Sequence, residues 1–87
     1  MALYRIERQW PPLSQEELDA APFRAVTCLL RFPDLKWQRS YYDTATNRSP
    51  CYYEAEAPEN IRRHAELAPV PCDEIAAVVE YLPERYQ

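Results

Sequence analysis

Hydrophobic and polar residues alternate with a period of two at the start of the chain. Between residues 3 and 10, the apolar side chains of Tyr4, Ile6 and Trp10 are interleaved with polar ones. This pattern is typical of a β-strand with one buried face. Prolines at positions 11 and 12 cannot donate backbone hydrogen bonds to a sheet, so the strand is expected to end before them.

A helix is predicted directly after these prolines. Ser14 and Glu17 have the spacing of a capping box, in which each residue satisfies a backbone N–H of the other. Apolar residues then recur at helical spacing toward Phe32. Pro22 removes a donor within this stretch, so we expect a kink or a restart near Ala21.

The middle of the chain predicts a β-hairpin. In the segment 35–42, alternation places Trp37, Arg39 and Tyr41 on one face of a strand. The segment 43–49 is polar and turn-rich, and the segment 51–55 again has the composition of a strand.

The last third predicts a second helix and a final strand. Pro58 suits a first helical position, and Ile61 begins an apolar stripe behind it. The segment 75–82 is an apolar run interrupted by Glu80, which indicates a strand buried on much of both faces. Pro83 is expected to end it.

The element order is therefore βαββαβ, and we predict a single α+β domain over residues 1–87 with a ferredoxin-like fold. Right-handed crossovers place both helices on one face of a four-stranded antiparallel sheet. The other face would then expose aromatic and charged side chains, and large exposed apolar patches usually mark interfaces. We therefore expect a homodimer in which two sheets pack face to face, as in a dimeric α/β-barrel.

Composition narrows the function classes. The formal net charge of −4 argues against binding to nucleic acid or to an anionic membrane surface. No apolar run reaches the length of a membrane span, and the N-terminus lacks the apolar core of a signal peptide. The three cysteines are widely spaced and odd in number, which favours reduced thiols and a cytoplasmic location. Because glycine is absent, turns that need positive φ must use Asn or Asp.

One candidate site is a ligand pocket in the chamber between two sheets. If the uncovered face carries Glu7, Arg39, Tyr41 and Tyr53, these side chains could orient a polar molecule. The alternative is an ion-pair and hydrogen-bond network that satisfies the dimer interface. Cys51 joins this set as a thiol that Arg39 could activate, or it is a small core residue.

A second candidate site is a metal centre. His64 is the chain's one histidine, and nickel accepts imidazole readily, so His64 and a carboxylate such as Glu54 could bind it across a dimer. The alternative is a histidine on the helix surface that is partly packed and binds nothing.

Residues spread along the chain resemble a family of small bacterial proteins of uncharacterised function, described as nickel-binding-protein-like. The resemblance covers nearly the whole chain through residues that match in order and spacing: Ile6, Glu7, Arg8, Trp37, Ser40, Tyr41, Cys51, Tyr53, Glu54, Ala55, Ile61, Arg62 and His64. It implies a dimeric ferredoxin-like fold and, in at least one branch of the family, the capacity to bind nickel.

Three hypotheses follow. The leading one is a homodimeric protein that binds nickel, another divalent transition metal or a small ligand. The second is a dimeric α/β-barrel enzyme of oxygenase or isomerase type, or a carrier, with its pocket between the sheets. This analogy rests on fold alone, and whether the protein is an enzyme stays open. The third is a structural accessory subunit.

Overall fold

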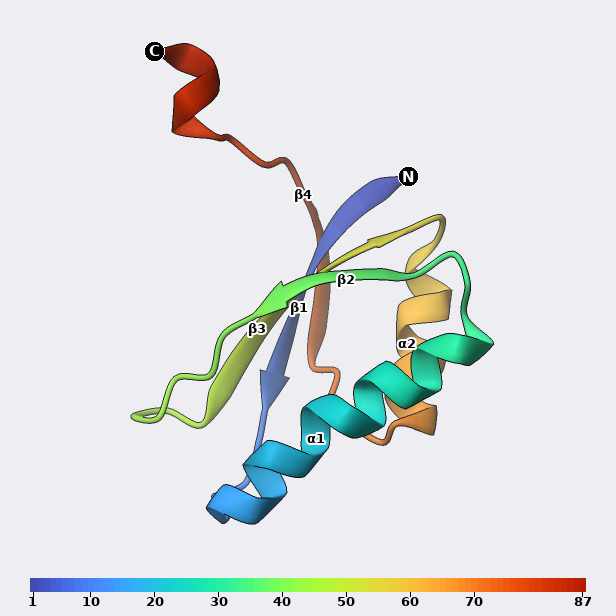
Figure 1. The fold of residues 1–87 in the computed structure, drawn as a ribbon, viewed down its shortest axis with the longest axis vertical. Coiled ribbons are helices and arrows are strands. Elements are labelled where there is room, and N and C mark those ends of the chain that lie inside the picture. Colours follow the sequence, from blue (N-terminus) through green and yellow to red (C-terminus); the bar gives the residue numbers. More distant parts are fainter.

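The structure is a computed structural model that describes residues 1–87. Its strands and α-helices, in chain order, are β1 (Ala2–Gln9), α1 (Gln15–Cys28), β2 (Lys36–Ser40), β3 (Arg48–Ala55), α2 (Pro58–Leu67) and β4 (Glu74–Val78). The strands form one antiparallel sheet in the order β2-β3-β1-β4, and both helices lie on one side of it (Figure 1). The predicted α+β, ferredoxin-like βαββαβ fold is confirmed.

Helix α1 begins where the capping box predicts. The backbone N–H of Glu17 donates to the Ser14 hydroxyl at 3.2 Å, and the N–H of Ser14 donates to the Glu17 carboxylate at 3.0 Å. Of the kink or restart expected near Ala21, the restart does not occur, because the helix continues through Pro22 to Cys28. Pro22 is solvent-exposed, so water can hydrate the carbonyl that its missing N–H leaves unpaired.

Helix α2 packs on the sheet and closes the hydrophobic core. Pro58 occupies its first turn as predicted, and Ile61, His64 and Ala65 are buried on its inner side. The core consists of six buried residues from the strands, the segment before β2 and α2: Ile6, Leu35, Cys51, Tyr53, Ala55 and Ile61. Neither helix is long and apolar enough to cross a membrane.

Helix α1 contributes much less to this core. Its buried residues are Ala21 and Ala25, whose side chains are single methyl groups. Its close neighbours are α2 and the 3₁₀ turn Leu29–Arg31. The space between α1 and the sheet is therefore incompletely filled.

Strand β2 contains a β-bulge that the sequence pattern did not reveal. Trp37 pairs with Tyr53 and Arg39 pairs with Tyr52, so Gln38 is an extra residue opposite β3. The extra residue reverses the alternation. Trp37 consequently stacks on the inward-facing Tyr53, while Arg39 lies over the outward-facing Tyr52. The prediction that Trp37 and Arg39 share a face is wrong.

Strand β4 is shorter and more exposed than predicted. It ends at Val78 rather than near Leu82, and none of its residues is fully buried because it is an edge strand. Residues 79–87, which we call the C-terminal arm, project away from the body of the molecule (Figure 1). The side chains of Val79, Tyr81 and Tyr86 in this arm are 77%, 74% and 71% exposed.

The β2–β3 connection shows how a chain without glycine turns. Asn47 has the chain's one positive φ, 56°, and asparagine tolerates this region better than most residues. The Asp43 carboxylate accepts from the backbone N–H of Ala45 at 2.8 Å, which tightens the loop. The expectation that Asn or Asp would replace glycine is confirmed here.

Candidate functional site

A cavity of about 430 Å³ lies between α1 and the inner face of the sheet. This volume falls within the range of roughly 300–1,000 Å³ that is typical of small-molecule sites. The wall is mainly aromatic and aliphatic, with polar groups from the strands: Arg8, Trp10, Leu13, Gln15, Leu18, Ala21, Pro22, Ala25, Trp37, Ser40, Tyr41, Tyr42, Thr44, Ser49, Cys51, Tyr53 and Val70. The small inward residues of α1 are the physical cause of the cavity.

The only charged residue in this wall is Arg8 of β1. Its side chain is 3% exposed, and it lies on the same face of the strand as Ile6. Its Nε donates to Cys51 Sγ at 3.3 Å, and its Nη1 donates to the carbonyl of Pro71. No carboxylate pairs with it, because the ion pairs of the chain involve Arg5 and Arg39 instead.

Two tryptophan–serine pairs hold polar groups at the cavity wall. The indole N–H of Trp10 donates to Ser49 Oγ, and that of Trp37 donates to Ser40 Oγ, each at 2.8 Å. Each serine oxygen is thus held in place by an indole N–H, and its O–H group can still donate to a further acceptor. All four residues line the cavity.

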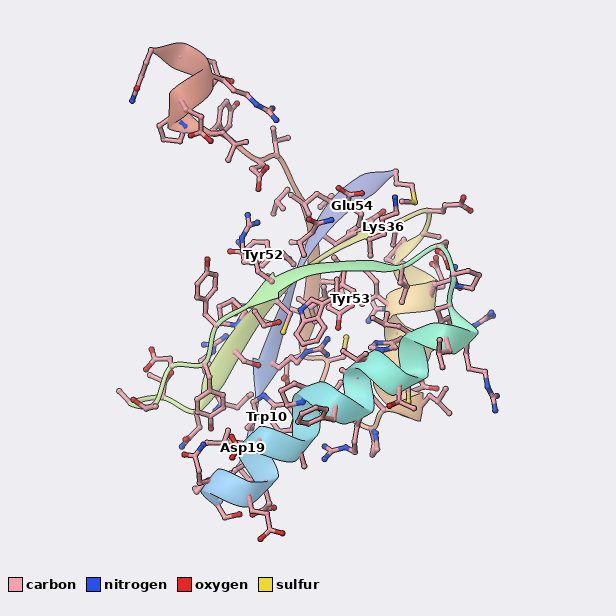
Figure 2. All side chains as sticks on the ribbon, viewed as in Figure 1. Trp10, Asp19, Lys36, Tyr52, Tyr53 and Glu54 are labelled. Atoms are coloured by element: carbon pink, nitrogen blue, oxygen red, sulfur yellow. The ribbon has the colours of Figure 1, made fainter.

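Tyr53 forms the centre of the sheet side of the cavity. Figure 2 shows it projecting between the sheet and α1, whereas Tyr52 projects from the opposite face. Its ring stacks on Trp37 with centroids 6.1 Å apart. Burial raises the pKa of Tyr53 to about 12, so its hydroxyl stays protonated at neutral pH.

His64 is buried behind this wall rather than at the helix surface. Its Nε2 lies 2.8 Å from the carbonyl oxygen of Ala25, which requires that Nε2 carries the proton. Nδ1 is buried and has no hydrogen-bond partner. Burial lowers the pKa of His64, although the bond to Ala25 opposes this, so the neutral imidazole is favoured.

The structure divides the predicted ligand residues between two sides of the sheet. Cys51, Tyr53 and the exposed Tyr41 line the cavity. Glu7 and Arg39 lie on the open face, where Arg39 binds Glu80 with Nη2 and Oε2 2.6 Å apart. The bulge in β2 places Arg39 on the face opposite to the residues that line the cavity. The cationic neighbour of Cys51 is therefore Arg8, not Arg39.

The predicted metal ligands do not form a site within one chain. His64 lies in the helix-side core, whereas Glu54 alternates with the buried Tyr53 and Ala55 and thus faces the other side of β3. No group of three or more His, Cys, Asp or Glu side chains gathers anywhere in the chain. The Arg8 charge acts on His64, and a metal cation beside this guanidinium would be repelled. The residues around the free Nδ1 atom therefore do not fit nickel.

Sequence reasoning missed the roles of Arg8, Trp10 and Ser49 in the cavity. A signal for Arg8 was present, because it shares the parity of Tyr4 and Ile6 on the apolar face of β1. A charged residue on a buried strand face is rare unless it is paired or functional.

Comparisons with known proteins add the family. The fold matches the crystal structure of SCO4226 from Streptomyces coelicolor A3(2), with a TM-score of 0.77 and 20% sequence identity over 93% of this chain and 100% of that one. A search of curated proteins finds no match. A family model described as nickel responsive protein SCO4226-like matches residues 4–78. This chain belongs to that SCO4226-like family.

Proposed function

We propose that this protein is a small homodimeric ligand-binding protein of the cytoplasm, and that the ligand occupies the cavity between α1 and the sheet. The observation that carries this proposal is the cavity itself: about 430 Å³, lined mainly by apolar and aromatic side chains, with a few fixed polar groups. Such a combination is typical of small-molecule sites.

A filled-cavity variant tests the site. Ala21 is buried and lines the cavity, so Ala21→Leu places a larger side chain into the space that a ligand would use. Ala20→Leu, an exposed position one residue earlier on α1, is the matched control. Both tryptophans of the chain line the cavity, so their fluorescence reports occupancy.

With 1-naphthamide as a neutral aromatic probe, the wild type and Ala20→Leu should bind with similar affinity. Ala21→Leu should lose at least about tenfold in affinity, because the probe and the leucine compete for one volume. If all three proteins bind the probe equally, or if the wild type binds neither this probe nor its carboxylate analogue 1-naphthoate, the cavity is not a ligand site.

The open face of the sheet supports the homodimer. Arg39 lies over the ring of Tyr52 at 5.2 Å and pairs with Glu80, and the neighbouring Leu3 and Val78 are half-buried. Figure 1 shows that no helix covers this face. Isologous pairing of two such faces is the commonest form of dimer.

Sedimentation equilibrium at micromolar concentration should give twice the chain mass of 10.3 kDa. Tyr52→Glu places a charge at the centre of the open face and should shift the protein to monomer. Arg63→Glu, on the exposed side of α2, is the control and should leave the dimer intact. A wild-type monomer under these conditions would contradict the proposal.

A second candidate function is the binding of nickel or another divalent transition metal, which the family description favours. Because one chain gathers no ligand set, such a site would have to combine open-face carboxylates, such as Glu54, from two copies. Calorimetric titration of the tag-free protein with Ni²⁺ should then give a response that Glu54→Gln weakens and His64→Gln leaves unchanged. Absence of both a heat response and bound metal by elemental analysis would remove this candidate.

A further inference from the structure

We propose that the ligand of this cavity is a small organic anion, a carboxylate on a flat apolar body, and that Arg8 binds its charged group. This inference rests on the proposed ligand-binding function and adds the chemical class of the ligand. It follows from the one charge in the cavity wall, from the hydrogen-bond donors around it and from the aromatic surfaces opposite.

Arg8 brings an unbalanced charge into the cavity wall. A guanidinium that is 3% exposed is normally paired with a carboxylate, because an isolated buried charge is strongly unfavourable. Arg8 has no such partner in the chain: its guanidinium donates to Cys51 Sγ and to the carbonyl of Pro71, which carry no formal negative charge. An anion in the cavity would supply the missing charge and accept the remaining N–H groups.

Hydrogen-bond donors are aligned across three strands beside Arg8. Arg8 of β1 is the register partner of Ser49 of β3, and Ser40 of β2 is the register partner of Cys51. Both serine hydroxyls accept from an indole N–H, so each can donate its own hydrogen to a ligand. The wall contains no Asp or Glu that would repel an anion.

The rest of the cavity wall suits a flat apolar ligand body. Trp10, Trp37 and Tyr53 present aromatic surfaces, while Leu18 and Ala21 of α1 supply the opposite apolar wall. Flat rings pack well between such surfaces. The exposed lining residues Gln15 and Thr44 mark the mouth, between the start of α1 and the β2–β3 loop. A ligand that enters there meets Arg8 at the buried end.

The test compares 1-naphthoate with 1-naphthamide, two probes of nearly equal size that differ in charge. Binding is followed by tryptophan fluorescence and by calorimetry on the full-length protein. The wild type should bind 1-naphthoate about tenfold or more tightly than 1-naphthamide, because charge-assisted hydrogen bonds are stronger than neutral ones.

Arg8→Met should abolish this preference and retain affinity for 1-naphthamide, whereas Arg63→Met, an exposed position, should keep the preference. Ser49→Ala keeps the guanidinium and should weaken 1-naphthoate about three- to tenfold. If Arg8→Met fails to fold, Ser49→Ala and the wild-type comparison of the two probes together test the anionic ligand.

Equal affinity of the wild type for the two probes would overturn the anionic ligand and leave the ligand-binding function standing. A preference for 1-naphthoate that survives both Arg8→Met and Ser49→Ala would also overturn it. Failure of both probes to bind the wild type would instead defeat the proposed function itself.

Discussion

At the scale of single residues, the protein encloses two polar groups that its own chain does not fully satisfy. Arg8 is a buried guanidinium without a carboxylate partner, the buried Nδ1 of His64 has no hydrogen-bond partner, and both residues lie near Tyr53. Buried polar atoms without partners are few in native proteins, and each calls for an explanation. For Arg8 the explanation is a ligand, whereas for His64 it is the packing of a neutral ring against Phe32 and Tyr53.

The buried histidine predicts a pH dependence of stability. Burial lowers the folded-state pKa of His64 below its usual value of 6.5. As the pH falls through 6.5, the unfolded chain therefore binds a proton that the folded chain does not. The contribution of His64 is thus fully present above this pH and is lost as the pH falls toward the folded pKa, by at most about 1.4 kcal/mol per pH unit.

Urea unfolding between pH 7.5 and 5 measures this effect. In His64→Gln the amide Nε2 can still donate to Ala25, but it does not titrate. The free energy of unfolding of His64→Gln should therefore fall less steeply with decreasing pH than that of the wild type. Both proteins have the same carboxylates, so the difference between the two slopes reports His64 alone. Parallel slopes would show that His64 does not titrate differently in the two states.

At the scale of elements, the bulge in β2 decides which side chains reach the cavity. Gln38 is exposed and has no partner position on β3. Removing it would make Trp37 and Arg39 consecutive, and these two already face opposite sides of the sheet. Deletion of Gln38 should therefore preserve the fold and lower the free energy of unfolding by no more than about 2 kcal/mol.

Deletion of Tyr52 is the comparison. It removes a residue from the regular strand β3, so the side chains on one side of the deletion move to the opposite face of the sheet. Thermal unfolding followed by circular dichroism should show a cooperative transition for the first deletion and none for the second. A folded Tyr52 deletion beside an unfolded Gln38 deletion would refute the assigned register.

The order of elements was predictable from sequence because each boundary carries a local signal. The capping box at Ser14 and the proline at the first position of α2, Pro58, depend only on residues close by in the sequence. The bulge was not predictable, because alternation in 35–42 looks regular and the extra residue depends on pairing with β3. Glu7 and Arg39 lie on the face of the sheet opposite to Cys51 and Tyr53. This separation was not predictable, because the sequence showed neither the extra residue Gln38 nor which face of β1 is inward.

At the scale of the whole molecule, the C-terminal arm and the open face are both left largely uncovered by the rest of the chain. The arm carries exposed Val79, Tyr81 and Tyr86, and Glu80 in it binds Arg39 on the open face. Arm and open face are thereby parts of one surface. In the proposed dimer, both would be covered by a second copy.

Truncation after Val78 should therefore weaken the dimer and leave the fold intact, because β4 ends at this residue. Sedimentation equilibrium should show a dissociation constant raised about tenfold or more, since burial of large apolar side chains drives association. Arg85→Gln, which keeps the apolar residues of the arm, should behave like the wild type. An undiminished dimer after truncation would place the interface elsewhere.

The short alanines on the inner side of α1 have a consequence for motion. An element supported by few buried contacts opens locally at a lower free energy than one that closes a core. Amide hydrogens of α1 should accordingly exchange with deuterium faster than those of α2, which carries Ile61 and His64 into the core. A ligand in the cavity should slow amide exchange in α1 more than in α2. The exchange rate of α1 would then report whether the cavity is occupied.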